Sequence, residues 1–243
     1  MIKFFQKIRQ NLLMENKTGK YFKYAIGEIV LVMVGILLAL QVNNWNELRK
    51  QRQKEIVNLS ELKKGLESDL ITELIPGIDF YVRKEKAVNK LKGFYNDTQI
   101  IPNDSLLRYF RISLTGEWNF IFNVATYENL KSTGIDIISN DSLRAKISSL
   151  YSNEYPELIT RGDRVLRYYE NHVDPVLDDN INLYDSILSK NDLENLKFNI
   201  QITNRTRSLN SQRRGLLKIA MEIKPKVESL INDINKELER NEK

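Results

Sequence analysis

The sequence predicts a mostly α-helical protein, in which an N-terminal transmembrane helix precedes an α-helical domain with a long antiparallel helical stalk. An uninterrupted apolar run near the start indicates the span, and apolar residues recurring at intervals of three and four indicate amphipathic helices. Only 5 prolines and 10 glycines occur in the chain, few for an all-β fold with many turns. We therefore divide the chain into residues 1–23, 24–45 and 46–243.

The membrane span is predicted from the run between Ile29 and Leu40, which contains no polar side chain. At about 1.5 Å per residue, a helix over residues 24–45 can cross a hydrocarbon core of about 30 Å. A cleaved signal peptide would have an earlier apolar stretch and two small residues spaced as in A-x-A, and the second is missing here. A buried core helix, apolar on every face, would need a larger domain around it. We therefore expect an uncleaved signal anchor.

The ends of the span match the two membrane–water interfaces. Lys20, Lys23 and Tyr24 mark one end and Trp45 marks the other, as basic and aromatic side chains do at headgroup level. Glu28 is an ionisable residue inside the span. Because it lies about one turn from the interface, its carboxylate is expected to reach towards the headgroups. Pairing with a partner or handling a proton is the alternative for this residue.

Gly35 and Ala39 form a small-xxx-small pair within the span. Small residues at this spacing permit close packing of a second helix, so the pair is a candidate for self-association.

The orientation follows from a small charge bias. Lysine and arginine are slightly more numerous before the span than after it, and cytoplasmic flanks carry such an excess. This predicts a cytoplasmic segment 1–23 and an exported domain 46–243, hence a bacterial inner-membrane protein with a periplasmic C-terminal domain. The basic first segment also has apolar residues at helical spacing, typical of an amphipathic helix on an anionic leaflet; a frayed leader is the alternative. These residues are Ile2, Phe5, Ile8 and Leu12.

Several stretches resemble a known family. The specific ones are Met1–Phe5, Ile8–Leu13, Lys17–Tyr21, Ala25–Val32, Gly35–Leu37 and Ala39–Glu47, and looser ones are Thr126–Gly134 and Ile138–Asn140. Together they resemble an uncharacterised family of single-span membrane proteins from Bacteroidetes-type bacteria, classified as a domain of unknown function. The resemblance implies a single-pass bacterial membrane protein and brings no catalytic residue with it.

Two apolar stripes predict the helical stalk. The first ends at Pro76 and Gly77, which are expected to break or kink the chain, and the second is nearly a heptad repeat with a bend at Pro225. An antiparallel pair would bury both stripes, and self-association as a coiled coil between chains is the alternative. The first stripe is Ile56, Leu59, Leu62, Leu66, Leu70 and Leu74; the second is Leu216, Ala220, Ile223, Val227, Leu230, Ile234 and Leu238.

Shorter elements are predicted between the stripes. A short helix is expected over residues 105–112, followed by alternating aromatic residues that we assign to the core rather than to a ligand cage. Thr126 is expected to cap a helix that Gly134 closes, and Asn140 or Asp141 to begin another. The alternating aromatic residues are Trp118, Phe120 and Phe122.

The sequence contains no predicted catalytic, cofactor-binding or metal-ligating set. The absence of cysteine excludes disulfides and thiolate sites, and the common nucleotide and hydrolase motifs are missing. The single histidine, His172, lies near Asp174 and could form a proton relay or one metal ligand; packing or capping is the alternative. Four arginines are assigned to the polar face of a helix, with contact to an anionic surface as the alternative: Arg205, Arg207, Arg213 and Arg214.

The predicted function is a membrane-anchored, non-enzymatic scaffold, assembly or sensing protein that acts through protein contacts. Its expected partners are the lipid bilayer and either other proteins or further copies of itself, with no nucleic acid and no cofactor. The alternative is an enzyme or ligand-binding domain whose carboxylates and tyrosines come together only in the fold. A cytoplasmic nucleic-acid binder would require the opposite orientation.

Overall fold

The computed structural model describes residues 18–241, without the side chains of residues 18–21, 24 and 241. It forms two units, one ending at Lys54 and the other beginning at Glu55. Throughout residues 18–241 the regular elements are helices and no strand occurs, so the predicted mostly α-helical fold is confirmed. The amphipathic helix predicted near the start falls on residues 1–17, outside the described residues.

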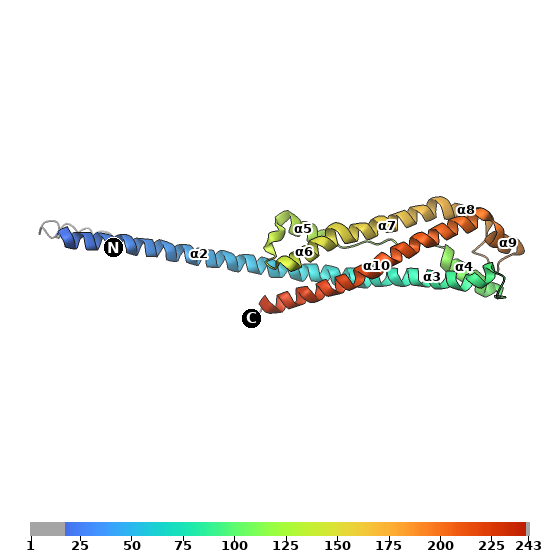
Figure 1. Ribbon diagram of the computed structural model, residues 1–243, viewed down its shortest axis with the longest axis horizontal. Coiled ribbons are helices and arrows are strands. Elements are labelled where there is room, and N and C mark those ends of the chain that lie inside the picture. The colour runs from blue at the N-terminus through green and yellow to red at the C-terminus, as the bar shows by residue number, and fades with distance from the viewer. Residues whose placement is uncertain (1–17, 242–243) are drawn as a thin grey trace. The chain divides into compact units, whose positions relative to one another are not determined.

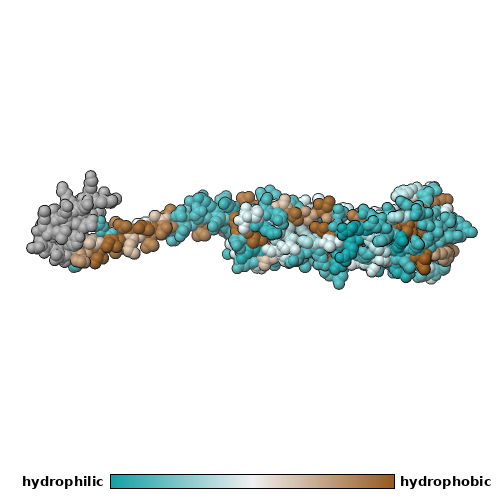
Figure 2. Space-filling model, turned by 90° about the horizontal axis from the view of Figure 1, so that it is seen from above, coloured by the Kyte–Doolittle hydropathy of each residue, from teal (hydrophilic) through white to brown (hydrophobic). Residues whose placement is uncertain are grey.

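Helix α2 (Thr18–Asp69) forms the described part of the first unit and continues into the second. An 18-residue window in this helical segment has a mean hydropathy of 2.4, and none of that window is buried within the protein. Figure 2 shows these apolar residues as a brown stretch of the helix. The helix is therefore long and apolar enough to cross a membrane.

The second unit is built from helices that differ widely in length. Helix α10 packs against both α3 and α7, and Figure 1 shows these three side by side. After α2 the elements are η1 (Leu70–Leu74), α3 (Ile75–Tyr95), α4 (Asn103–Leu114), α5 (Ala125–Thr133), η2 (Ile135–Ile137), α6 (Asp141–Ser149), η3 (Leu150–Glu154), α7 (Tyr155–Tyr168), η4 (Tyr169–Val173), α8 (Asp174–Asn180), α9 (Lys190–Phe198) and α10 (Ile200–Asn241).

Both predicted stripes supply buried residues to the core of the second unit. Each stripe is covered by the same chain, so neither is left exposed over its length for a second copy. Burial of each such leucine or isoleucine side chain stabilises the fold by about 1.5–3 kcal/mol. The buried members are Leu59, Leu62, Leu66 and Leu74 from the first stripe, and Leu216, Ala220, Ile223, Val227, Leu230 and Ile234 from the second.

Three π-helical turns, η1, η3 and η4, each come just before a proline: Pro76, Pro156 and Pro175. In each turn the last N–H before the proline bonds to the carbonyl five residues back, as from Ile75 to Leu70. Proline has no N–H and its ring clashes with the carbonyl four residues earlier, and a wider turn relieves that clash. Helical backbone therefore continues on both sides of the first proline. Of the break or kink predicted there, the break is wrong, and a wider turn takes its place.

Gly77, at the start of α3, allows the segment that follows α4 to lie directly against the helix. A Cβ atom at this position would lie 2.5 Å from Cε1 of Phe120 and 3.0 Å from Cδ1 of Trp118. Phe120 stacks on Phe122 with ring centroids 6.1 Å apart, and Phe122 stacks on Tyr155 at 3.9 Å. Both phenylalanines are buried, so the assignment of these aromatic residues to the core is confirmed.

The predicted helix caps have mixed outcomes. Asn140, one of the two predicted starts, is the N-cap of α6, and its side chain accepts the backbone N–H three residues later at 3.1 Å. Thr126 is not a cap, because α5 begins at Ala125 and the side chain before it makes no capping bond. Gly134 does end α5, with a φ of 102° that favours glycine.

Candidate functional site

Three charged side chains are buried where α3, α10 and the segment between α4 and α5 meet. Lys84 on α3 is 3% exposed, Arg213 on α10 is 4% exposed, and the side chain of Glu117 in the connecting segment is 0% exposed. Burying a charge is unfavourable unless the charge is paired and hydrogen-bonded. This Lys84–Glu117–Arg213 cluster is therefore the first candidate for a functional site.

Arg213 joins α10 to two other segments of the chain. Its guanidinium pairs with Glu117, with Nε donating to Oε1 at 2.9 Å. Nη1 donates to the Ser113 carbonyl at 2.5 Å and to Asn210 Oδ1 at 3.2 Å. The second carboxylate oxygen of Glu117, Oε2, is buried and has no hydrogen-bond partner among the described residues. That oxygen can accept a hydrogen bond from a water or a ligand.

Lys84 is held by carbonyl groups rather than by a carboxylate. Its Nζ donates to the Thr115 carbonyl at 2.7 Å and to the Ile112 carbonyl at 3.2 Å, and lies 4.7 Å from the ring centroid of Phe80. Burial lowers the pKa of Lys84 to about 7; the nearby Arg213 acts in the same direction, and Glu117 opposes it. Lys84 therefore loses its proton more readily than an exposed lysine does.

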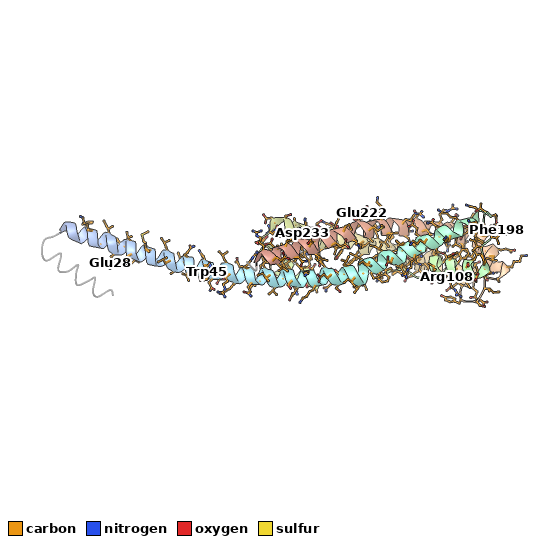
Figure 3. All side chains as sticks on the ribbon, turned by 90° about the horizontal axis from the view of Figure 1, so that it is seen from below. Glu28, Trp45, Arg108, Phe198, Glu222 and Asp233 are labelled. Atoms are coloured by element: carbon orange, nitrogen blue, oxygen red, sulfur yellow. The ribbon has the colours of Figure 1, made fainter. Side chains whose placement is uncertain are left out.

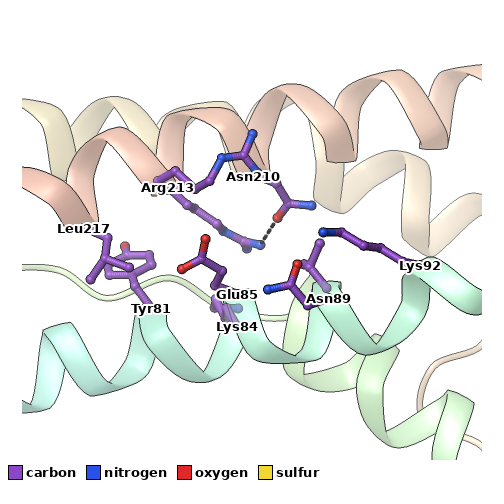
Figure 4. Close-up of a pocket in the computed structure, with 10 residues that line it drawn as sticks. Tyr81, Lys84, Glu85, Asn89, Lys92, Asn210, Arg213 and Leu217 are labelled. Carbon is purple, nitrogen blue, oxygen red and sulfur yellow. Dashed lines mark hydrogen bonds between the residues drawn. The ribbon is translucent and has the colours of Figure 1, made fainter.

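A cavity of about 210 Å³ lies beside the cluster, between α3 and α10 (Figure 4). Ligand pockets usually begin at about 300 Å³ and one water takes about 30 Å³, so this space suits several waters or a small polar group. Figure 4 shows that its wall comes from both helices. The lining residues are Tyr81, Lys84, Glu85, Val88, Asn89, Lys92, Asn210, Arg213, Arg214 and Leu217.

A larger space, which we call the α3–α4 groove, lies on the other side of α3. Its volume is about 670 Å³, within the range of about 300–1,000 Å³ typical of ligand sites. Lys84 lines both this groove and the smaller cavity. The remaining lining residues are Phe80, Arg83, Lys86, Ala87, Lys90, Arg108, Tyr109, Ile112 and Thr115.

A second buried polar group lies at the end of α2. Asp69 is 2% exposed; its Oδ1 accepts the backbone N–H of Asn123 at 2.8 Å. Asp69 Oδ2 and the Tyr155 hydroxyl are both buried, and neither has a hydrogen-bond partner among the described residues. Burial raises the pKa of Asp69 to about 6, although the bond from Asn123 acts in the opposite direction. Burial also raises the pKa of Tyr155.

The described residues of the predicted membrane interfaces lie on the surface of α2. Lys23 and Trp45 are exposed, and the side chains of Lys20 and Tyr24 are outside the description. Glu28 is half-buried, and Figure 3 labels it on the same helix as Trp45.

The small-residue pair occupies an open part of the same helix. A Cβ atom at Gly35 would meet nothing within 4 Å, and Ala39 is exposed. The helix surface at these positions is therefore free to receive another helix, which keeps self-association there a prediction.

His172 and Asp174 are near each other in sequence but bond to different groups. The His172 ring lies 5.0 Å from that of Tyr168, and its carbonyl accepts a hydrogen bond from Arg205 at 2.8 Å. Asp174 accepts the Tyr169 hydroxyl at 2.6 Å. In the part of the chain that the structure describes, no interaction joins these two residues and no group of three potential metal ligands occurs.

Residues 28–203 match a family described as a family of unknown function, DUF6090. The chain belongs to the DUF6090 family. Among curated proteins and solved structures, none matches the chain. The predicted resemblance to a family of unknown function is thereby confirmed, while the single span and the Bacteroidetes-type origin stay predictions. In this DUF6090 protein the match includes Lys84, Glu117 and Asp69 and ends before Arg213.

The sequence prediction missed the buried charges of this DUF6090 protein. Arg213 was assigned to a polar helix face, which is wrong because it is buried. A usable signal was present: Lys84 follows Tyr81 by three residues and Arg213 follows Leu209 by four, so each charge sits on the apolar side of its helix. A charged residue in such a position indicates a buried pair or a site.

Proposed function

We propose that this protein is a membrane-anchored scaffold, assembly or sensing protein that acts through protein contacts of its helical domain. Residues 24–45 span the bacterial inner membrane as a signal anchor, with the N-terminus in the cytoplasm and the domain in the periplasm. The observation that carries the proposal is the unburied apolar window of the helical segment that begins at Ala25. Exposing so much apolar surface to water is unfavourable, whereas the hydrocarbon core of a bilayer would cover it.

The antiparallel stalk belongs to this proposal. Ser139 donates to Glu55 at the start of the second unit, and the neighbouring Asn140 donates to Glu237 near the end of α10. Further along, Tyr81 and Leu217 line the same cavity. As residue numbers rise from Glu55 along α2 and α3, those of their neighbours on α10 fall, which supports an antiparallel arrangement.

The second candidate function is an enzyme or ligand-binding domain built from carboxylates and tyrosines. It is favoured by the proximity of Asp69 to Tyr155 in the interior, where burial raises the pKa of both groups. Against it, Asp69 is almost fully shielded from solvent, so a substrate could not reach its carboxylate without movement of the helices.

Affinity capture from membranes tests the leading proposal. The full chain is used as bait after mild crosslinking in cells, and the control bait joins residues 1–54 to an unrelated soluble domain. We expect a stoichiometric protein partner with the full chain that the control bait does not capture. Equal capture by both baits, or no partner with the full chain, would contradict action through contacts of the helical domain.

A further inference from the structure

Among the described residues, the exposed cations of the α3–α4 groove form no ion pair with an acidic side chain. Arg83, Lys86 and Lys90 lie on α3 and Arg108 lies on α4; Figure 3 labels Arg108 there. All four are exposed, no ion pair joins any of them to a carboxylate among the described residues, and no acidic residue lines the groove. The lining of the groove therefore carries four exposed cations and no carboxylate, and the nearest carboxylate on α4, Asp104, forms no ion pair with Arg108 among the described residues.

This arrangement is unfavourable for the helix by itself. Arg83, Lys86 and Lys90 follow one another at intervals of three and four on one side of the helix, and like charges four residues apart destabilise a helix. Helix α10 shows the opposite pattern, because Lys218 pairs with Glu222 four residues later. A bound anion would remove the repulsion on α3.

The two carboxylates of α3 do not neutralise the groove. Asp79 lies one turn before Arg83 but forms no ion pair with it. Glu85 lines the cavity between α3 and α10 instead of the groove. The floor of the groove adds Lys84, a further cation when protonated.

The groove also has an aromatic wall. Phe80 comes from α3 and Tyr109 from α4, and both are half-buried. Aromatic side chains offer a flat apolar surface, and arginine and lysine bind phosphate and carboxylate groups. The volume of about 670 Å³ fits a small molecule rather than an extended protein segment.

We propose that the α3–α4 groove binds a small organic anion with two or more phosphate or carboxylate groups, whose apolar part lies against Phe80 and Tyr109. Arg83, Lys86 and Lys90 contact the anionic groups from one side and Arg108 from the other. The proposal goes beyond anchoring and protein contacts, and it does not depend on the orientation of the chain in the membrane.

Calorimetric titration of the full chain in a non-ionic detergent tests this assignment. The probes are citrate, benzene-1,3,5-tricarboxylate and tripolyphosphate, with acetate as the monovalent comparison. The groove variant is Arg83→Gln with Arg108→Gln. The control variant removes two exposed arginines from α7, Arg164→Gln with Arg167→Gln, and the helical circular dichroism of both variants is compared with the parent.

We expect at least one multivalent probe to bind with a Kd at least tenfold below that of acetate, and benzene-1,3,5-tricarboxylate to bind more tightly than citrate. The groove variant should weaken that binding at least tenfold, and the control variant less than twofold. Equal weakening by both variants would show a general charge effect and overturn the proposal. An absence of binding by all three multivalent probes would also overturn it. Groove-dependent binding of polyglutamate, titrated in parallel, would in that case indicate an acidic protein segment as the partner.

Discussion

Arg213 on α10 and Glu117 in the segment between α4 and α5 form a buried ion pair across 96 positions of sequence. The same guanidinium holds the carbonyl of Ser113 at the end of α4. One side chain thereby fixes the connecting segment and its aromatic residues against the helices. The pair is more a determinant of which arrangement forms than a large source of stability, since desolvation offsets much of the attraction between the charges.

Breaking this pair should destabilise the protein strongly. Arg213→Leu leaves the Glu117 carboxylate buried without its counter-charge, which we expect to lower the free energy of unfolding by about 3–5 kcal/mol. The matched control is Arg214→Gln on the exposed side of the same helix, expected to change it by less than about 0.5 kcal/mol. Urea denaturation in detergent measures both. Equal effects of the two substitutions would show that the buried pair does not hold the segments together.

Two glycines should respond oppositely to the same substitution. Gly77→Ala places a methyl group 2.5 Å from the Phe120 ring, so overpacking should exceed the gain in helix propensity and destabilise the fold by about 1–3 kcal/mol. Gly215→Ala on α10 meets nothing within 4 Å and should stabilise it by roughly 0.5–1 kcal/mol. Thermal unfolding shows whether each variant melts above or below the parent protein. A Gly77→Ala variant that melts at or above the parent temperature would mean that the fold does not require the close approach of Phe120.

Asp69 should make stability fall as the pH rises from about 4 to about 6. Its pKa is 3.8 in the unfolded chain and about 6 in the folded protein, so the folded state holds the proton more tightly between these values. At about 1.4 kcal/mol per unit, up to about 3 kcal/mol of stability present below pH 4 is lost by pH 6.5. Lys84 titrates near pH 7, above most of this window.

Asp69→Asn isolates that contribution. The amide oxygen can still accept the Asn123 N–H, but it does not ionise, so the variant should lack the loss of stability between pH 4 and 6.5. The exposed Asp79→Asn is the control and should follow the parent protein. Urea denaturation at several pH values gives the difference between variant and parent. A constant difference across the window would contradict the raised pKa.

Converting the π turn η1 into an ordinary α-helical turn should be tolerated only if Pro76 is replaced as well. Deleting the exposed Ile71 returns residues 70–74 to α-helical spacing, in which Pro76 clashes with the carbonyl four residues earlier. We expect the deletion alone to destabilise the protein by about 3 kcal/mol or more, and Pro76→Ala in the same chain to recover most of the loss. Denaturation midpoints of the two variants decide this; no recovery would mean that the turn has another cause.

The sequence was sufficient for the helical class because the stripes through Leu59 and Leu216 follow the helical period without ambiguity. The start of α6 was predictable to within one residue, at Asn140 or Asp141, because a capping side chain acts within one turn. At Pro76 the sequence left a break or a kink open. The helix does not break, because one wider turn relieves the clash of the proline ring, and periodicity does not reveal such a turn. Prediction failed at Thr126 because the preceding backbone already follows the helical path.

The buried charges were harder to predict for a different reason. Arginine is usually a surface residue, so the residue type alone does not indicate that Arg213 is buried. Its burial depends on Glu117, which lies far away in sequence. Asp69 likewise gains its environment from Asn123 and Tyr155, which belong to other elements. A single helix wheel can show that a charge faces the core, but only the assembled fold shows which group meets it.

The most direct test of the account is the location of the C-terminus in living cells. Alkaline phosphatase and a fluorescent protein are fused separately after Lys243, and a control set lacks residues 29–40. We expect phosphatase activity, no fluorescence and a carbonate-resistant membrane pellet for the full chain, with all three reversed in the deletion. A fluorescent, phosphatase-inactive fusion of the full chain, or its release from the membrane by carbonate, would contradict an anchored protein with an exported helical domain.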